Sequence, residues 1–203
     1  MSRRVRSLAL ASVGLLALAG CTHVPSTSAS AHDAFFVNLQ ALCGQAFAGA
    51  VEVDRPVMPG NGDFAGKPLV MHVRDCDEDT VRIPFNVGGD RSRTWVVDRT
   101  DTGLRLKHDH RHPDGTSDAV TMYGGDTKRT GSPARQEFPV DAESVAMFGR
   151  EGLAASVANT WAMELQPGQR FVYELARPGG RLFRVAFDLS APVLPPPPPW
   201  GSD

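Results

Sequence analysis

The chain has 203 residues, of which 41% are hydrophobic and 22% are charged, and 21 lysines and arginines stand against 23 aspartates and glutamates. A net charge of −2 provides no basic surplus that could hold a phosphate backbone, so the composition argues against a nucleic-acid partner. A chain of this length can bury an ample hydrophobic core in one domain without the help of a metal ion.

The first twenty residues have the composition of an export signal. Three arginines among the first six residues precede an apolar run from Leu8 to Ala19. This run is shorter than the roughly 20 residues that a membrane-spanning helix needs, and a basic start followed by a short apolar segment is typical of a signal peptide. We therefore predict that residues 1–20 are a signal peptide, which the mature protein lacks.

The apolar run ends in Leu18-Ala19-Gly20-Cys21. Small residues directly before a cysteine resemble the lipobox of bacterial lipoproteins. The resemblance implies that Cys21 carries a diacylglycerol, becomes the first mature residue and anchors the chain in a membrane. Inner-membrane lipoproteins often have Asp after this cysteine, whereas Thr22 follows here, so the resemblance implies an outer-membrane protein that faces the periplasm. An ordinary secretory signal with an incidental cysteine is the alternative.

Two further cysteines, Cys43 and Cys76, remain once Cys21 is set aside. Two cysteines in an oxidising compartment are typical of one disulfide. On the chain-entropy model, closing this loop would stabilise the fold by about 4 kcal/mol. Two free buried thiols are the alternative.

The segment after the lipobox changes from polar to amphipathic. Residues 21–32 are rich in small and polar side chains and predict a flexible tether between lipid and domain. From Asp33 to Cys43 the apolar residues recur at helical spacing, and Ser30 with Asp33 could start the helix. We predict a helix here that packs on the following domain.

From about residue 46 the apolar residues alternate with a period of two, which is typical of half-buried strands. Pro84 indicates an edge or a bulge in its strand, and Asp141 is placed to start a short helix near residues 142–148. The predicted strands are 46–53, 68–76, 80–87, 92–100, 104–112, 118–125, 135–140, 161–166, 170–176 and 181–189.

Eight to ten short strands at hairpin spacing predict a mostly β domain over residues 33–190, built as an antiparallel β-barrel. A β-sandwich is the alternative. The leading helix, glycine-containing first strand and successive hairpins resemble the lipocalin/calycin layout, although "CGQAFAG" has phenylalanine where the lipocalin motif has tryptophan. The block "DRSRTW…LRLKHDHRH…DG" resembles small uncharacterised envelope lipoproteins of proteobacteria, a resemblance that implies no activity. Residues 191–203, with "PVLPPPPPWG", predict an extended tail outside the core, which is a spacer or a docking ligand.

One predicted strand carries half of the histidines of the chain. Leu104, Leu106, His108, His110 and His112 share one face of this strand, because alternate side chains point the same way. The two leucines make that the buried face, so the histidines continue the inward row toward one end of the barrel. There they could bind a divalent metal such as zinc, orient a ligand, or fill a wet strand end.

Spacing limits the metal hypothesis. Adjacent members of the row lie about 6.6 Å apart, and His108 and His112 lie about 13 Å apart on a straight strand. Zinc requires its nitrogen ligands at about 2.0–2.1 Å, so a site would combine two of these imidazoles with a ligand from a neighbouring strand. Asp118 and Tyr123 are candidates for that reach.

A second candidate ligand-binding site comprises Arg93 and Trp95 on the predicted strand 92–100 and Tyr123 on the predicted strand 118–125. An arginine beside an aromatic ring could bind an anionic or aromatic group. Surface arginines beside a core tryptophan are the alternative. The chain contains no GxSxG elbow, Walker loop or GxGxxG motif, and we predict no catalytic residue.

Three functions fit these patterns. The first is a lipid-anchored, non-enzymatic barrel that holds a small hydrophobic or amphipathic ligand. The second is a metal-dependent enzyme that uses His108, His110 and His112. The third is an envelope inhibitor or assembly factor that binds a protein partner. The sequence favours a binding or interaction module over an enzyme; its expected partners are the membrane, through the lipid on Cys21, and a small molecule or an envelope protein.

Overall fold

The computed structural model describes residues 30–57, 64 and 66–202. The predicted signal peptide, the lipobox cysteine Cys21 and most of the predicted tether lie outside the described residues. Among the described helices, none is long and apolar enough to cross a membrane.

Strands dominate the described part of the chain. The helices are α1 (Ala31–Gln40), α2 (Ala142–Arg150) and a short 3-10 helix, η2 (Ala154–Ala158). The strands are β1 (Ala46–Arg55), β2 (Leu69–His72), β3 (Asp75–Cys76), β4 (Thr80–Val87), β5 (Asp90–Thr100), β6 (Gly103–His110), β7 (Tyr123–Asp126), β8 (Arg135–Pro139), β9 (Thr160–Gln166), β10 (Arg170–Arg177) and β11 (Arg181–Val193).

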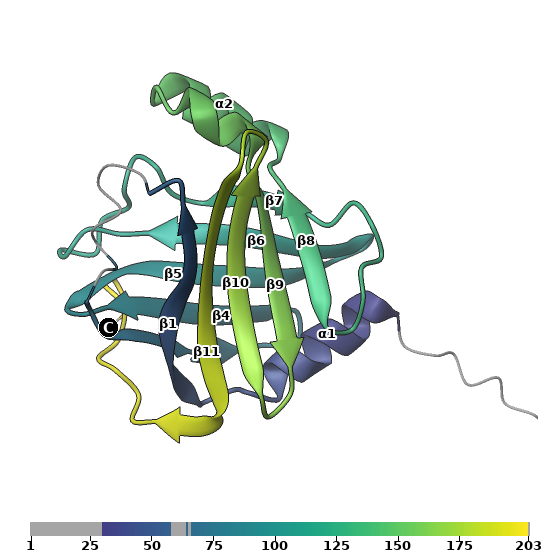
Figure 1. The fold of residues 1–203 in the computed structure, drawn as a ribbon, viewed down its shortest axis with the longest axis vertical. Helices are drawn as coiled ribbons and strands as arrows, with labels where there is room; N and C mark the ends of the chain where they lie inside the picture. Colours follow the sequence, from purple (N-terminus) through teal and green to yellow (C-terminus); the bar gives the residue numbers. More distant parts are fainter. Residues whose placement is uncertain (1–29, 58–63, 65, 203) are drawn as a thin grey trace, which may run out of the picture.

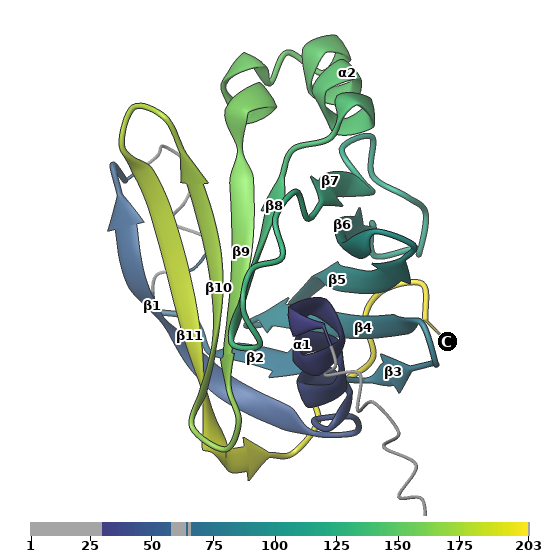
Figure 2. The same ribbon diagram turned by 90° about the vertical axis from the view of Figure 1, so that its right-hand side faces the viewer.

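These strands form one antiparallel sheet that curls into a nearly closed barrel. Its order is β7-β6-β5-β4-β2-β1-β11-β10-β9-β8, with β3 added to β4. In Figure 1, β1 and β8 to β11 form a front wall, and β4 to β7 cross behind it. Figure 2 shows the two walls from the side, with α1 against one end. The predicted antiparallel barrel is therefore confirmed, and the sandwich alternative is not.

Two glycines of β7 allow the barrel to close against β8. The backbone nitrogen of Asp141 donates to the carbonyl oxygen of Gly124 at 2.9 Å, just beyond the end of β8. A Cβ atom on Gly125 would lie 1.8 Å from the carbonyl oxygen of Pro139, and one on Gly124 would lie 1.8 Å from that of Leu106. A side chain at Gly125 would therefore push β7 away from the end of β8, and one at Gly124 would push it away from β6.

The helix α1 packs into the end of the barrel. Its predicted start is confirmed, because the Ser30 hydroxyl accepts from the backbone nitrogen of Asp33 at 3.1 Å. The helix begins at Ala31, two residues before the predicted position, and buries Phe35 and Phe36 completely. The far end of β5 holds it there: Arg99 pairs with Asp33 and lies 4.3 Å from the centre of the Phe36 ring.

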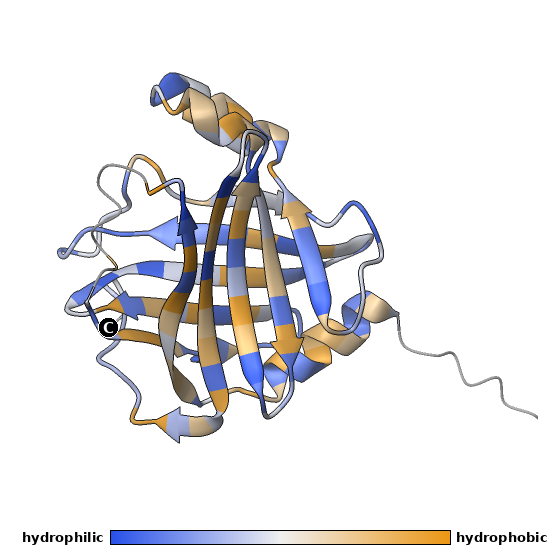
Figure 3. Cartoon of the chain, in the orientation of Figure 1, coloured by the Kyte–Doolittle hydropathy of each residue, from blue (hydrophilic) through white to orange (hydrophobic). Residues whose placement is uncertain are grey.

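Alternation along the strands separates the core from the surface. Figure 3 shows hydrophobic and hydrophilic residues succeeding one another along the strands of the front wall. On β11, Phe183, Val185, Phe187 and Leu189 are buried, and the residues between them are more exposed. One residue on the outward face of β6 is nevertheless buried: Lys107 lies under the start of α2, with Nζ 2.9 Å from Asp141 and 3.0 Å from Glu143.

The predicted strand 68–76 is two strands in the structure, β2 and β3, and both pair with β4. Residues 69–71 pair with the end of β4 at Phe85 to Val87, and Asp75–Cys76 pair with Val81 and Arg82. Pro84, which cannot donate a backbone hydrogen bond, lies between these two paired stretches. The proline thus occupies the place where β4 has no ladder partner on that side, as its sequence context indicated.

The predicted disulfide is present. Cys43 and Cys76 are bonded, with their Cα atoms 6.3 Å apart. The bond joins the segment that follows α1 to the short strand β3.

The C-terminal segment folds back onto the outside of the barrel. Strand β11 runs to Val193, three residues past the predicted domain end. Farther along, the backbone nitrogen of Trp200 donates to the carbonyl oxygen of Arg91 at 3.1 Å, and the Arg91 guanidinium donates to the Pro198 carbonyl at 2.9 Å. The tail therefore contacts the start of β5, while Leu194 between them is 90% exposed.

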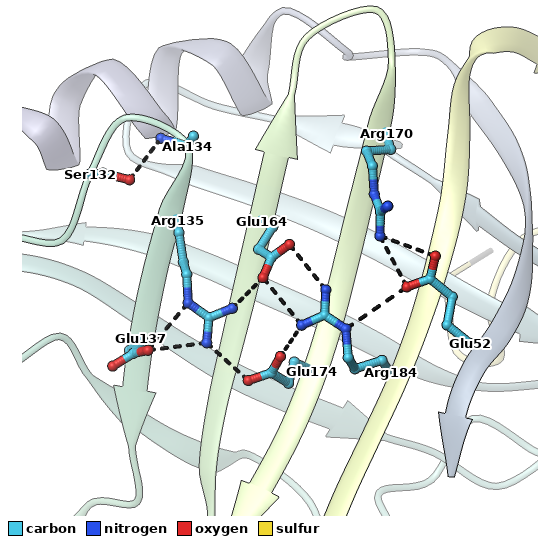
Figure 4. A network of polar contacts seen from close by, with 9 residues as sticks. All are labelled: Glu52, Ser132, Ala134, Arg135, Glu137, Glu164, Arg170, Glu174 and Arg184. Atoms are coloured by element: carbon cyan, nitrogen blue, oxygen red, sulfur yellow. Dashed lines mark hydrogen bonds and ion pairs between the residues drawn. The ribbon is translucent and has the colours of Figure 1, made fainter.

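Charged side chains form a ladder across the outer surface of the front wall (Figure 4). Arg135 on β8 and Arg184 on β11 each pair with both Glu164 and Glu174. Glu52 on β1 extends the ladder, with 3.0 Å between its carboxylate and the guanidinium of Arg170. Because it links strand to strand, the ladder stabilises this wall through cross-strand pairs.

Candidate ligand-binding cavity

A cavity of about 260 Å³ lies between the two walls. It lies toward the end away from α1: Arg99, at the far end of β5, contacts α1, whereas Arg93, near the start of the same strand, lines the cavity. The lining residues are Phe64, Phe85, Arg93, Thr94, Trp95, His108, His110, Tyr123, Tyr173, Leu175, Arg181 and Phe183.

Stacked aromatic rings make up much of the cavity wall. The Trp95 indole lies between Phe85, with ring centres 4.9 Å apart, and Tyr173, with ring centres 4.5 Å apart. The interplanar angles are 18° and 21°, so the three rings are close to parallel. Phe64 and Phe183 add a second pair with centres 5.0 Å apart. Such flat apolar surfaces suit a planar ligand.

His108 is a buried hydrogen-bonding centre of the cavity wall. Its Nδ1 lies 3.0 Å from the carbonyl oxygen of Tyr123, and its Nε2 lies 2.8 Å from the hydroxyl of Tyr173. A carbonyl oxygen can only accept, so Nδ1 carries the proton and Nε2 accepts from the tyrosine. Both ring nitrogens are therefore engaged.

His110 and Tyr123 continue this chain of contacts. The Tyr123 hydroxyl lies 3.0 Å from Nε2 of His110, and the Tyr123 ring stacks on His108 with centres 4.6 Å apart. Asp118, the other predicted candidate, accepts through its side chain from the backbone nitrogen of Val120 at 2.8 Å, and its charge opposes the effect of burial on the pKa of His110.

Burial keeps this group uncharged near neutral pH. It lowers the pKa of His108 to about 3, an effect that the neighbouring His110 strengthens, and it lowers the pKa of His110 to about 4, together with the charge of Arg93. Burial likewise raises the pKa of Tyr123 to about 12 and that of Tyr173 well above its ordinary value. The imidazoles are thus neutral and the phenols protonated.

Two arginines supply the positive charge of the cavity. Arg181 is only 7% exposed; its Nη1 pairs with Asp54 and donates to the carbonyl oxygen of Pro56 at 2.9 Å. Its Nε is buried and has no hydrogen-bond partner among the described residues. Arg93 pairs with Asp90 and lies 5.6 Å from the centre of the Phe64 ring.

Comparison of the chain with protein-family models, with curated proteins and with solved structures finds no match. The argument for function therefore rests on the cavity itself.

The structure brings together the residues that were predicted to bind a ligand. Arg93, Trp95 and Tyr123 all line the same cavity. His108 and His110 join them, as the inward row predicted, whereas His112 lies past the end of β6 and is exposed.

The metal hypothesis gains no ligand set from this geometry. Within residues 30–57, 64 and 66–202, no three or more His, Cys, Asp or Glu side chains are grouped so that they could hold a metal ion. His108 uses both of its nitrogens in hydrogen bonds, and His112 does not line the cavity. Zinc binding by the three histidines stays a prediction that a direct metal analysis can test.

Sequence reasoning missed the residues of the opposite wall. Tyr173 and Leu175 alternate with outward residues on β10, and Arg181 begins the inward row that continues through Phe183. The signal was the period of two along the predicted strand 181–189, because Arg181 lies two residues before Phe183 and therefore points to the same, buried face. A charged residue in such a row is a candidate binding group.

Proposed function

We propose that the protein is a non-enzymatic binding module that holds a small, planar, amphipathic ligand inside its barrel. One observation carries the proposal: an interior cavity of about 260 Å³ combines stacked aromatic rings with a few polar groups. Sites for drug-sized ligands measure about 300–1,000 Å³. This cavity is smaller than that range, so we expect a ligand with a single ring or with two fused rings.

The hydrogen bonds of the cavity favour binding over acid–base catalysis. A general base works best with a pKa near the operating pH, whereas the pKa values of His108 and His110 are about 3 and 4. His108 is also held between Tyr123 and Tyr173 through both nitrogens. These groups support the shape and polarity of the site.

The proposed localisation is argued from the sequence. The Leu18–Cys21 lipobox supports attachment to the outer membrane through a lipid on Cys21, with the barrel in the periplasm. The bond between Cys43 and Cys76 fits an oxidising compartment. The ligand would then be a small molecule that reaches the periplasm.

Calorimetric titration of the purified protein with naphthalene-2-carboxylate and naphthalene-2-carboxamide tests this function. We expect saturable binding of at least one of these two-ring probes with one site per chain. Substitution Leu175→Trp fills the cavity and should weaken that binding by about tenfold or more, while Leu194→Trp, at an exposed position of the tail, should leave it unchanged. Binding of neither probe, or equal binding by the Leu175→Trp variant, would overturn the proposal.

A further inference from the structure

We infer that the cavity selects an aromatic carboxylate, with the rings between the aromatic side chains and the carboxylate held by Arg181 and Arg93. The inference rests on the proposed binding function and names the class of its ligand. It follows from the charge of the lining, the unused donor of a buried guanidinium, and the positions of the two cations.

The charged residues of the described lining are all positive. Its twelve residues include two arginines and no aspartate or glutamate. The carboxylates that pair with these arginines, Asp54 and Asp90, are not part of the lining. Each arginine is thus paired from outside the lining, and the charged groups that the described lining itself presents to the cavity are both guanidiniums, which suit an anion.

Arg181 offers a donor that the protein leaves unused. A guanidinium carries five N–H donors in a planar fork, yet the hydrogen bonds of Arg181 to Asp54 and Pro56 both come from Nη1. Nε is buried without a partner in the described chain. Other arginines also have an unpartnered nitrogen, namely Arg74, Arg170 and Arg177, but of these four only Arg181 lines the cavity. A carboxylate is the group whose two oxygens match such a fork.

The two cations flank the same aromatic pair. The guanidinium of Arg93 lies 5.6 Å from the centre of Phe64, and that of Arg181 lies 5.8 Å from the centre of Phe183. The two phenyl rings are themselves 5.0 Å apart. A carboxylate at this side of the cavity would be near both cations, and the attached ring would extend among the aromatic side chains of the lining.

The remaining polar groups of the cavity carry no charge. His108 and His110 are neutral at physiological pH, because burial holds their pKa values at about 3 and 4. The Tyr173 hydroxyl donates a hydrogen bond to Nε2 of His108. The positive charge in the cavity therefore comes from the two arginines, which stay protonated in proteins.

An isosteric pair of probes tests the charge preference in the unaltered protein. Naphthalene-2-carboxylate and naphthalene-2-carboxamide have nearly the same shape and differ in charge. We expect the carboxylate to bind at least about tenfold more tightly at neutral pH, and more weakly as salt is added. Equal affinity for the two probes overturns the inference but leaves the binding function standing. Binding of neither probe overturns the binding function itself.

Variants locate the effect. Arg93→Gln and Arg181→Lys should each weaken carboxylate binding by about tenfold and change carboxamide binding by less than about threefold. The lysine retains the charge in the buried position and loses the planar fork, so it tests geometry without leaving Asp54 unpaired. Arg82→Gln, on the exposed outer side of β4, is the matched control and should bind like the unaltered chain. Unchanged carboxylate affinity in both cavity variants refutes the assignment of the arginines.

Discussion

Buried histidines in this barrel act as neutral hydrogen-bonding groups, despite a spacing that suggests metal ligands. His108 accepts a hydrogen bond from the Tyr173 hydroxyl of β10 and donates one to the backbone carbonyl of Tyr123 on β7, so it connects strands of the two walls. A protonated imidazole could not accept from the tyrosine. The folded state therefore resists protonation at this site, and stability is linked to pH.

The free energy of unfolding is expected to fall as the solution is acidified below the ordinary histidine pKa. Burial lowers the pKa of His108 from 6.5 to about 3, so between these values the unfolded chain binds a proton that the folded chain excludes. Linkage then predicts that His108 alone removes about 2 kcal/mol of stability between pH 7 and pH 5. Urea unfolding at the two pH values measures this loss, to which His110 adds in the same direction.

Two substitutions assign the loss to its source. His108→Gln supplies one donor and one acceptor in a group that does not titrate, so the pH dependence should shrink by about 2 kcal/mol. His112→Gln removes an exposed imidazole from the same row and should retain it. An unchanged pH dependence in His108→Gln would show that this histidine has the same pKa in the folded and the unfolded chain, which contradicts the lowered value.

For single residues, the sequence predicted the face to which a side chain points but not the residue with which it forms a hydrogen bond. The period of two correctly placed His108 on the face of Leu104 and Leu106, because side-chain direction is local. Its partner Tyr173 is 65 residues away, on a strand that reaches it only through the closure of the barrel. Local patterns do not fix which strands face each other.

Among the elements, β7 is a short strand that is held by close backbone contacts and not by side-chain packing. The predicted strand 118–125 is reduced to four residues, Tyr123–Asp126, and its centre is Gly124-Gly125. Without side chains there, β7 approaches β6 on one side and the end of β8 on the other. Propensity alone would disfavour two glycines in a strand, yet the closure of the barrel requires them.

Substitution Gly125→Ala is expected to destabilise the barrel by about 1–3 kcal/mol or more, because the added Cβ would meet backbone that must shift. The obstructing atom is the Pro139 carbonyl oxygen, 1.8 Å from the Cβ position. Gly89→Ala is the matched control: its Cβ would meet nothing within 4 Å, so its effect should stay within about 0.5 kcal/mol. Urea unfolding of both variants checks the difference. Equal free energies of unfolding would mean that β7 and β8 can move apart without loss of stability.

Element boundaries followed local chemistry where the signal was local. The cap at Ser30 placed the start of α1 to within a few residues, and Asp141 marked the start of α2, where its side chain accepts from the backbone nitrogen of Ser144. The return of the tail onto β5 at Arg91 had no such local signal, because proline-rich segments look alike whether docked or free.

Across the whole molecule, two devices act on different parts of the barrel. The ladder of Figure 4 spans the wall of β8 to β11 and reaches β1. Burial opposes ionisation of Glu164, but hydrogen bonds and charge from Arg184 and Arg135 prevail and lower its pKa. The bond between Cys43 and Cys76 acts elsewhere and ties the segment after α1 to β3. The ladder strengthens contacts within one sheet, whereas the disulfide constrains the unfolded chain.

Reduction of that disulfide should lower the free energy of unfolding by about 4 kcal/mol, the value that the chain-entropy model gives for a loop of this length. The two cysteines are 33 residues apart, and the loop contains β1, β2 and the segment between them, so its release frees a large part of the unfolded chain. Urea unfolding with and without reductant measures the effect. The double variant Cys43→Ala/Cys76→Ala should resemble the reduced protein and be insensitive to reductant. A reductant effect that persists in this variant would show that the lost stability has another source than the bond between Cys43 and Cys76.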